Sequence, residues 1–454
     1  MPSTILDSSY YRDMFGTAAM RAVFSDEARL EAWLQTEVAL ARAQVATGVI
    51  PAGTDEKIAS AARIENIDQD AMKAEFDKVG FPILPFVKQL TRACDQETAR
   101  WVHYGATTQD ILDTGAVLQI REALQLVSTD LNACITALMK LAAKHRNTVM
   151  AGRTFQQQAA PITFGYKAAV WLDELLRHHN RLHELRKRVL VGQCAGAVGT
   201  FATLGEKGPA VQQKMMEHLE LSVPDITWHT ARDRWSELLG FLALCGATLG
   251  KIAQEVAILM RSEIGELSEP FETGRGASTT LPQKRNPIAC EPVIANAHRL
   301  RELASSQMIA MMQEHERGVG HMHVEWMVVP DAFVLMSGSL HHTRLILENL
   351  WVGAEQMRAN LDMGGGLLMS EAVMMGLAPL VGKSEAHHLV YAAAGRAMDQ
   401  KTTLREALLA DDAITAHLTV ARIDELLDPA NYTGMAGNMV DTVLKQAEKA
   451  LQNQ

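Results

Sequence analysis

The stretch "VLQIREALQLVSTDLNACITALMKL", residues 117–141, carries the clearest structural pattern of the chain. From Val117 to Leu141 its apolar residues recur in alternating steps of three and four. This spacing places them on one face of an α-helix. The same steps recur from Trp235 to Leu259. Two apolar seams of this length predict long, near-parallel helices that pack in a bundle.

The regions beside the seams extend this prediction. We expect further long helices over about residues 162–191 and 287–318, and another after Pro330. No proline stands between Pro85 and Pro161, which leaves room for an uninterrupted helix. No comparable run alternates strictly between apolar and polar residues, as a half-buried strand would. The predicted fold is all-α, with a central bundle of long helices.

Helix-breaking stretches divide the chain into three parts. The segment "KVGFPILPF" (residues 78–86) precedes the first seam, and three consecutive glycines occupy residues 364–366. We predict an N-terminal helical domain over residues 1–104, a central long-helix bundle over 105–363, and a C-terminal helical domain over 364–454.

Composition limits the class of protein. A formal net charge of −10 over 454 residues argues against a nucleic-acid binder, although local Arg and Lys can still bind an anion. The five cysteines are far apart and form no CxxC, which favours free thiols in a reducing compartment. Without an apolar run of about 18 residues or a signal-peptide pattern, we expect a cytoplasmic protein with no membrane span.

Two polar segments lie between the predicted long helices. In "WVHYGATTQD" (residues 101–110), Thr107, Thr108 and Asp110 precede a helix. They either cap its N-terminus or form, with the helix N–H groups, a cradle for a carboxylate. In "AGRTFQQQAAP" (residues 151–161), an arginine, a threonine and three glutamines make either a solvated loop or a set of donors for a polar ligand.

The third polar segment, "GASTTLPQKRNP" (residues 276–287), combines small residues with hydrogen-bond donors. Its glycine lets the backbone flex or approach a ligand closely, and Ser278, Lys284 and Asn286 bring polar groups. Pro287 is expected in the first turn of a helix whose N-terminus faces the same region. The composition favours a mobile lid with an anion hole over a polar surface turn.

Histidines cluster in "QEHERGVGHMHVEW" (residues 313–326). His315, His321 and His323 show no HExxH or other metal-ligand spacing. We therefore expect supporting polar contacts there rather than a metal site, and no metal or organic cofactor.

In their order, and between long helices, the three polar segments resemble those of the fumarase/aspartase superfamily. The lid of that family has the form Gly-Ser-Ser-x-x-Pro-x-Lys-x-Asn-Pro, with Met before the first proline. Ala277 to Pro287 follow it with three departures: Ala for Gly, Thr for the second Ser and Leu for Met. The stretches "WHTARDR", "HVEW" and "LDPANYTG" make the chain most similar to the bacterial 3-carboxy-cis,cis-muconate cycloisomerases of the superfamily.

Two departures concern the second polar segment. Phe155 stands where adenylosuccinate lyases of the superfamily usually carry His. Gln158 follows Gln157 where the cycloisomerases carry a Gln-His pair. Relative to those enzymes, a proton donor or a contact with a substrate carboxylate is therefore missing or replaced. The sequence does not decide which polycarboxylate is the substrate.

The resemblance implies proton transfer at a carbon next to a carboxylate. A substrate carboxylate adds to a double bond and closes a lactone while the enzyme protonates the α carbon; the reverse is an elimination. Ser278 would be the base, with Lys284, Asn286 and loop N–H groups stabilising the enolate-like charge. The candidates for substrate binding are Thr107, Thr108, Thr154, Gln157, His103, Arg21 and Arg317, and the candidate acid–base partner is His229.

The resemblance also implies a homotetramer in which three subunits build each active site around a small polycarboxylate from protocatechuate breakdown.

Two other functions are alternatives to the cycloisomerase reaction. One is a C–N or C–O lyase that releases fumarate from a substituted succinate. The other is a helical scaffold without activity, against which the retention of Ser278, Lys284 and Asn286 speaks.

Overall fold

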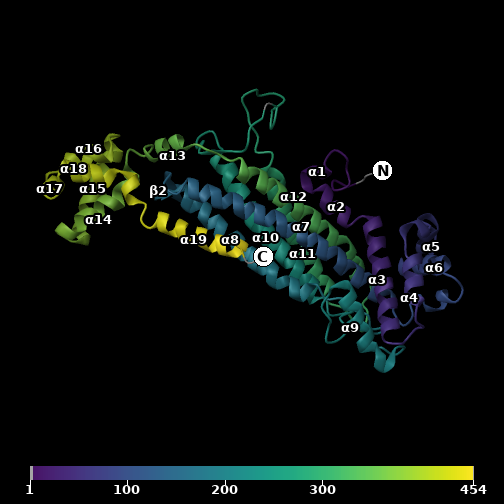
Figure 1. The fold of residues 1–454 in the computed structure, drawn as a ribbon. Coiled ribbons are helices and arrows are strands. Elements are labelled where there is room, and N and C mark those ends of the chain that lie inside the picture. The colour runs from purple at the N-terminus through teal and green to yellow at the C-terminus, as the bar shows by residue number, and fades with distance from the viewer. Residues whose placement is uncertain (1–3, 273, 453–454) are drawn as a thin grey trace. The chain divides into compact units, whose positions relative to one another are not determined.

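A computed structural model describes residues 4–272 and 274–452 of the chain. Helices dominate the fold (Figure 1), so the predicted all-α class is confirmed. Among the described residues, the strands form only two small antiparallel sheets: β1 (Val149–Thr154) with β2 (Gln157–Thr163), and β3 (Leu267–Ser268) with β4 (Trp351–Val352).

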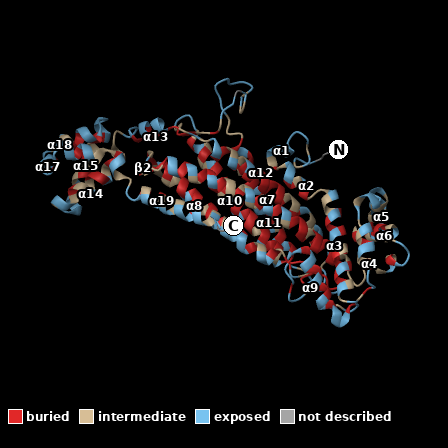
Figure 2. Cartoon of the chain, in the orientation of Figure 1, coloured by how far each residue is buried: buried red, intermediate tan, exposed pale blue. Residues whose placement is uncertain are grey.

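The longest helices are α7 (Thr108–Lys144), α8 (Phe164–Val189), α10 (Asp233–Leu259) and α12 (His321–Glu348). The two predicted seams lie on α7 and α10, and every seam residue is buried (Figure 2). On α7 these residues are Val117, Ile120, Leu124, Val127, Leu131, Cys134, Leu138 and Leu141. On α10 they are Trp235, Leu238, Leu242, Cys245, Leu249, Ile252, Val256 and Leu259. The 3–4 spacing therefore identified the buried faces correctly.

Two predicted helix starts are wrong. The helix expected from residue 287 to 318 is α11, which spans only Cys290–Ala310. Its first N–H groups are capped by a buried carboxylate, that of Glu269, so the helix starts after Pro287. The helix expected after Pro330 is α12, which contains this proline. The lost hydrogen bond is tolerated because α12 buries Val329 and Phe333 around it.

The second polar segment is not a loop but the β1–β2 hairpin. Phe155 and Gln156 form its turn, with φ of 50° and 64°. Left-handed conformations at both turn positions are those of a type I′ turn, which favours Asn and Gly. The sequence Phe-Gln therefore gave no turn signal, and the hairpin was missed.

Contacts group the chain into two compact units. The first takes the residues up to Leu131, His178–Gly250 and Pro292–His341. Besides segments of the long helices it holds α1 (Arg12–Phe15), α2 (Ala18–Val23), α3 (Asp26–Ala46), α4 (Thr54–Ala61), α5 (Gln69–Val79), α6 (Ile83–Ala93) and α9 (Gly208–Leu219). Its core includes a cluster around Trp33, Phe86 and Ile111.

The second unit takes Asn132–Arg177, Lys251–Glu291 and the residues from His342 onward. Its shorter helices are α13 (Ala354–Leu361), α14 (Ser370–Val381), α15 (Lys383–Gln400), α16 (Leu404–Leu409), α17 (Asp412–Thr415), α18 (Val420–Leu427) and α19 (Ala436–Gln452). The helices α14 to α18 enclose a separate apolar cluster (Figure 1). The three-part division at residues 105 and 364 stays a prediction.

By length and mean hydropathy, α7 and α10 each contain a window that is apolar enough to cross a membrane. Within these windows, 44% and 56% of the residues are buried. Helices that form a protein core pass the same test, so this finding is weak evidence for a membrane span.

A buried arginine ties the first unit together. The guanidinium of Arg232 lies between the rings of Trp228 and Trp235, 4.9 and 4.7 Å from their centroids. It donates to both carboxylate oxygens of Asp113 on α7, at 2.8 and 3.0 Å, and to Glu325 on α12. Burial lowers the pKa of Arg232, but the two carboxylates raise it more, so it stays charged. This network holds α7, α12 and the start of α10 in place.

We expect Arg232→Met to destabilise the protein by about 3–5 kcal/mol, because two buried carboxylates lose their cation. Urea unfolding measures the effect. The matched control is Arg405→Met, which removes an exposed pair with Asp424 and should leave the urea midpoint nearly unchanged. Equal midpoints for the two variants would contradict the structural role of Arg232.

Candidate active site

In the first unit, Asp110 organises the first polar segment. Its buried carboxylate accepts the N–H groups of Thr107, Ala195 and Gly196 at 3.0, 3.1 and 3.0 Å. A carboxylate in the first turn of α7 is also favoured by the helix dipole. Asp110 therefore caps the N-terminus of α7 and holds Ala195 and Gly196 beside it.

Because Asp110 does the capping, the two predicted threonines are left for other contacts. The hydroxyls of Thr107 and Thr108 make no hydrogen bond with any described residue, and both residues are half-buried. The first helical N–H groups lie beside them. Of the two alternatives from the sequence, this arrangement favours a cradle for a carboxylate over capping of the helix by threonine.

His229 also contacts Asp110. Its Nε2 lies 2.9 Å from Asp110 Oδ1, and the ring is buried. The other ring nitrogen, Nδ1, is buried without a hydrogen-bond partner among the described residues. The contact with a carboxylate favours a proton on Nε2, which leaves Nδ1 as an acceptor. Asp110 therefore holds the His229 ring in place, and the acid–base role of His229 stays a prediction.

Arg317 joins this cluster through Gln109. The side chain of Gln109 donates to the carbonyl of His229 at 2.7 Å and accepts from Arg317 Nε at the same distance. Arg317 also donates to the Ala197 carbonyl at 3.2 Å. The first unit therefore brings Thr107, Thr108, His229 and Arg317 together at the N-terminus of α7.

Arg21 lies outside this cluster. It donates to the carbonyls of Arg12 and Gly16, at 3.0 and 3.1 Å, and pairs with Asp13. No hydrogen bond or ion pair among the described residues joins it to the cluster. Its observed contacts hold α1 and α2, and its role in substrate binding stays a prediction.

His103 has a buried partner. Its Nδ1 lies 2.6 Å from Oε1 of Glu37 on α3, and its φ is 59°. Burial lowers the pKa of His103, but the charge and hydrogen bond of Glu37, with the charge of Asp110, raise it above its ordinary value. The pair with Glu37 therefore favours the charged form of His103 more than water does.

In the second unit, the residue pair next to the tip of the β1–β2 hairpin, Arg153 and Gln158, is anchored by polar groups. Arg153 forms two hydrogen bonds with the fully buried carboxylate of Glu266, at 2.9 and 2.6 Å. Asn360 also donates to Glu266, at 2.7 Å. Gln158, where the cycloisomerases carry His, donates to the Asn360 carbonyl at 2.8 Å. The Gln158 side chain therefore has a structural partner.

The hairpin tip, in contrast, is exposed. Thr154 and Gln157 pair across the turn and are both exposed, and Phe155 between them is 100% exposed. The predicted binding residues of this segment are thus presented on a rigid hairpin.

The third polar segment is closed into a loop at its base. The backbone N–H and the side-chain amide of Asn286 both donate to the Gly276 carbonyl at 3.1 Å. A Cβ at Gly276, whose φ is 67°, would lie 2.8 Å from the Asn286 oxygen. Ala277 and Arg285 pair across the same neck. Asn286 therefore latches the loop in this conformation.

Within the loop, the Ser278 hydroxyl oxygen accepts two backbone N–H groups, those of Thr280 at 3.3 Å and Leu281 at 3.1 Å. Two donors that converge on one oxygen favour negative charge on it. Lys284 lies in a neighbouring hollow of about 560 Å³, which Arg261 and Arg285 also line and no acidic residue lines. The loop and this hollow form a positively charged surface beside Ser278.

The sequence predicts that the N-terminus of α11 adds free N–H donors to this surface. The structure contradicts this. Ala289 and Cys290 both donate to Glu269, at 3.0 and 2.7 Å. Burial, then the charge of Glu269, raises the pKa of the Cys290 thiol, which keeps it neutral. Glu269 instead anchors the end of the loop.

Sequence reasoning missed the acidic anchors Glu37, Glu266 and Glu269. The stretch "GELSEP" (residues 265–270) has no apolar pattern that would have identified Glu266 or Glu269 as buried. Among the described residues, no three His, Cys, Asp or Glu side chains are grouped to hold a metal ion.

The raised pKa of His103 predicts how stability depends on pH. The folded chain binds this proton more tightly than the unfolded chain, so the ion pair with Glu37 contributes fully below about pH 6.5 and is lost as pH rises through the folded-state pKa. Between about pH 6 and pH 9 the wild type should lose stability relative to the double variant His103→Gln/Glu37→Gln. Urea unfolding over this range tests it, and a constant difference would contradict the raised pKa.

Known proteins are similar to this chain over nearly its whole length. The family described as "Lyase" matches residues 15–301, and "Adenylosuccinate lyase C-terminus" matches residues 366–443. The chain is 44% identical to the 3-carboxy-cis,cis-muconate cycloisomerase of Pseudomonas aeruginosa, over 95% of each chain. It is 42% identical to the N-acetyl-S-(2-succino)cysteine lyase of Dickeya dadantii, over 99% of this chain and 98% of that protein.

A solved structure agrees as well. The 3-carboxy-cis,cis-muconate lactonizing enzyme of Pseudomonas putida has a TM-score of 0.92 and 39% identity, over 98% of this chain and 100% of that one. Agreement of this extent in both sequence and fold does not depend on the three polar segments alone. The chain therefore belongs to the lyase family of the fumarase/aspartase superfamily, which includes the 3-carboxy-cis,cis-muconate cycloisomerases.

Proposed function

We propose that this chain is a 3-carboxy-cis,cis-muconate cycloisomerase-type enzyme. A substrate carboxylate adds to a double bond to close a lactone, and the enzyme delivers a proton to the carbon next to a second carboxylate. In the reverse direction the enzyme removes that proton and the lactone C–O bond breaks. Cycloisomerases with this name are 40–44% identical to the chain across several bacteria, which supports this reaction over the other lyase activities.

The observation that carries the proposal is the environment of Ser278. An ordinary serine hydroxyl is far too weak an acid to serve as a base after losing its proton. The N–H groups of Thr280 and Leu281 already point at its oxygen and would stabilise the alkoxide. Lys284, in the basic hollow beside it, would add positive charge near the enolate-like carboxylate.

The remaining predicted residues would hold the other carboxylates of the substrate. Thr107 and Thr108 offer hydroxyls beside the N-terminus of α7, and Arg317 offers a guanidinium in the same cluster. Thr154 and Gln157 offer a hydroxyl and an amide on the hairpin tip. His229, held by Asp110, is the proposed proton carrier.

We propose that these groups meet in a homotetramer with shared active sites, in the cytoplasm. The exposed Phe155 supports an assembly, because a fully exposed ring on a strained turn gains free energy when another surface covers it. The five cysteines are all free, which supports a reducing compartment.

One observation favours a second candidate, a lyase that releases fumarate from a substituted succinate. Gln158 stands where the cycloisomerases carry His, and its side chain donates to the Asn360 carbonyl. A relative of this chain is an N-acetyl-S-(2-succino)cysteine lyase. An assay separates the candidates: loss of diene absorbance with 3-carboxy-cis,cis-muconate supports the first, and fumarate from substituted succinates supports the second. No turnover of either would favour an inactive scaffold.

We expect Ser278→Ala to lower kcat by roughly 10²–10⁴-fold, because the base is removed. The KM and the thermal unfolding midpoint should stay unchanged. Thr279→Ala is the matched control, since that exposed hydroxyl contacts only the neighbouring Thr280 hydroxyl at 3.5 Å. If Ser278→Ala keeps most of its turnover, Ser278 is not the base.

We expect Gly276→Ala to lower kcat/KM roughly tenfold, because a Cβ there collides with the backbone at Asn286 and opens the neck of the loop. Gly274→Ala is the control: its φ is also positive, but its added Cβ meets nothing within 4 Å. Steady-state kinetics of both variants test this prediction. Equal losses would show that backbone strain, and not the neck contact, is responsible.

A further inference from the structure

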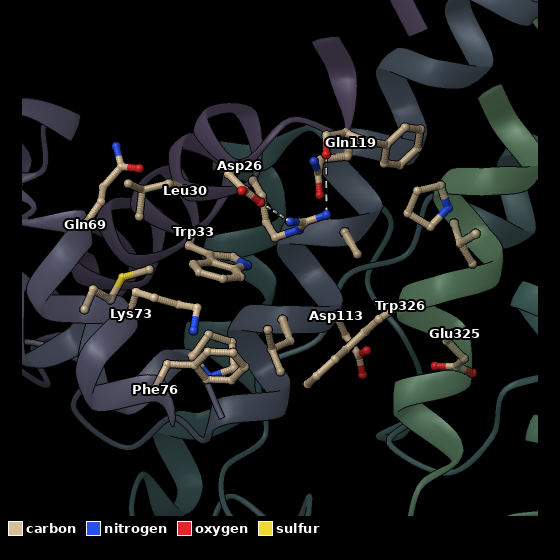
Figure 3. A pocket seen from close by; sticks show the side chains of 18 of the residues that line it. Asp26, Leu30, Trp33, Gln69, Lys73, Phe76, Asp113, Gln119, Glu325 and Trp326 are labelled. Carbon is tan, nitrogen blue, oxygen red and sulfur yellow. Dashed lines mark hydrogen bonds and ion pairs between the residues drawn. The ribbon is translucent and has the colours of Figure 1, made fainter. Parts of the chain in front are cut away.

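A second cavity lies in the first unit, away from every residue proposed above for catalysis or substrate binding. It has a volume of about 610 Å³ and lies among α3, α5, α7 and α12 (Figure 3). This volume is that of a typical small-molecule site. None of the three polar segments contributes a residue to its lining.

The walls of the cavity are aromatic and apolar. Figure 3 shows the rings of Trp33 on α3, Phe76 on α5 and Trp326 on α12 around the space. Trp33 is buried, but Phe76 and Trp326 are only partly covered. The helix α5 buries none of its own residues, although Met72 and Phe76 line the cavity. A bound apolar group would complete the burial of this face of α5.

The floor of the cavity carries an excess of negative charge. Asp113 and Glu325 line it, and both are buried. Among the described residues, Arg232 is the only cation that pairs with either, so two carboxylates share one guanidinium. In a region of low dielectric constant, the uncompensated charge acts strongly on a nearby ion.

The rim carries two acidic and two basic residues, Asp26 and Asp70 with Arg29 and Lys73. Asp26 pairs with Arg29 at 2.7 Å, and Lys73 pairs with Asp77 at 2.5 Å. Asp70 also lines the cavity and has no ion-pair partner among the described residues. The rim is therefore balanced in charge, and the excess lies in the floor, where Asp113 and Glu325 share Arg232. The floor favours a cation, and the three aromatic rings favour one with delocalised or quaternary charge.

We propose that this cavity binds an organic cation with an aromatic or similarly bulky apolar body. The body would lie between Trp33, Phe76 and Trp326, and the cationic group would face Asp113 and Glu325. Free carboxylates, which the proposed active site recognises, would be excluded by the same charges. The cavity is therefore a second ligand site of opposite charge preference.

Equilibrium dialysis of the full chain with three probes that share a naphthyl group tests the charge preference. The probes are (1-naphthylmethyl)trimethylammonium, its neutral isostere 1-(2,2-dimethylpropyl)naphthalene, and the anion 1-naphthylacetate. We expect the cation to bind at least tenfold more tightly than the neutral probe, and the anion least tightly. No binding of the cation, or equal binding of the three, would overturn the proposal.

Variants then test whether the probes bind in this cavity. Ala116→Trp fills the cavity from α7 and should weaken binding of the cation at least tenfold, while Ile226→Trp, at an exposed position outside the cavity, should not. Phe76→Leu keeps an apolar wall but removes one ring, so it should weaken the cation three- to tenfold and leave the neutral probe unchanged. If Ala116→Trp does not fold, Phe76→Leu decides: equal effects on both probes would overturn the proposal.

Two rim substitutions provide a matched test of charge. Asp70→Asn should weaken binding of the cation two- to fivefold, and Lys73→Gln should strengthen it by a similar factor. Both effects should shrink at high salt, because the rim is exposed. Changes in the same direction for the two variants would contradict the electrostatic preference. All four cavity variants should retain the wild-type turnover, so the outcome is separate from that of the proposed function.

Discussion

The buried cluster around Arg232 is the constraint on which the first unit depends. One guanidinium holds two carboxylates on different helices, Asp113 and Glu325, between two tryptophan rings. Gln193 and Gln307 donate further hydrogen bonds to the same carboxylates, at 2.8 and 2.9 Å. A buried ion pair is tolerated only when nearly all of its polar atoms have partners. This requirement fixes α7 and α12 in one relative position.

The same principle recurs at each of the three polar segments. Asp110 anchors the first segment, Glu266 the second and Glu269 the third, and all three carboxylates are buried. Each accepts hydrogen bonds from backbone or side-chain groups in or next to its segment. These bonds hold part of each segment in place, which helps to position a reacting group.

In contrast, the groups with proposed chemical roles lie at the exposed or half-exposed ends of these anchored segments. Thr107 and Thr108 precede α7, Thr154 and Gln157 flank a hairpin turn, and Ser278 and Lys284 lie on a latched loop. Rigid anchors with accessible tips suit residues that must bind a charged substrate. At the hairpin tip the backbone is also strained, because Phe155 and Gln156 both have positive φ.

The sequence alone was enough to predict the all-α class, the buried faces of α7 and α10, and the three polar segments. These features depend on local periodicity and on residue type, which act over a few turns of helix. Only the tertiary structure decided that α11 starts at Cys290, that α12 runs through Pro330, and that residues 149–163 form a hairpin. It also decided that Glu269 occupies the helix end expected to hold an anion. Each of these depends on partners distant in sequence or on turn conformations that the residue types disfavour, so no local pattern contains them.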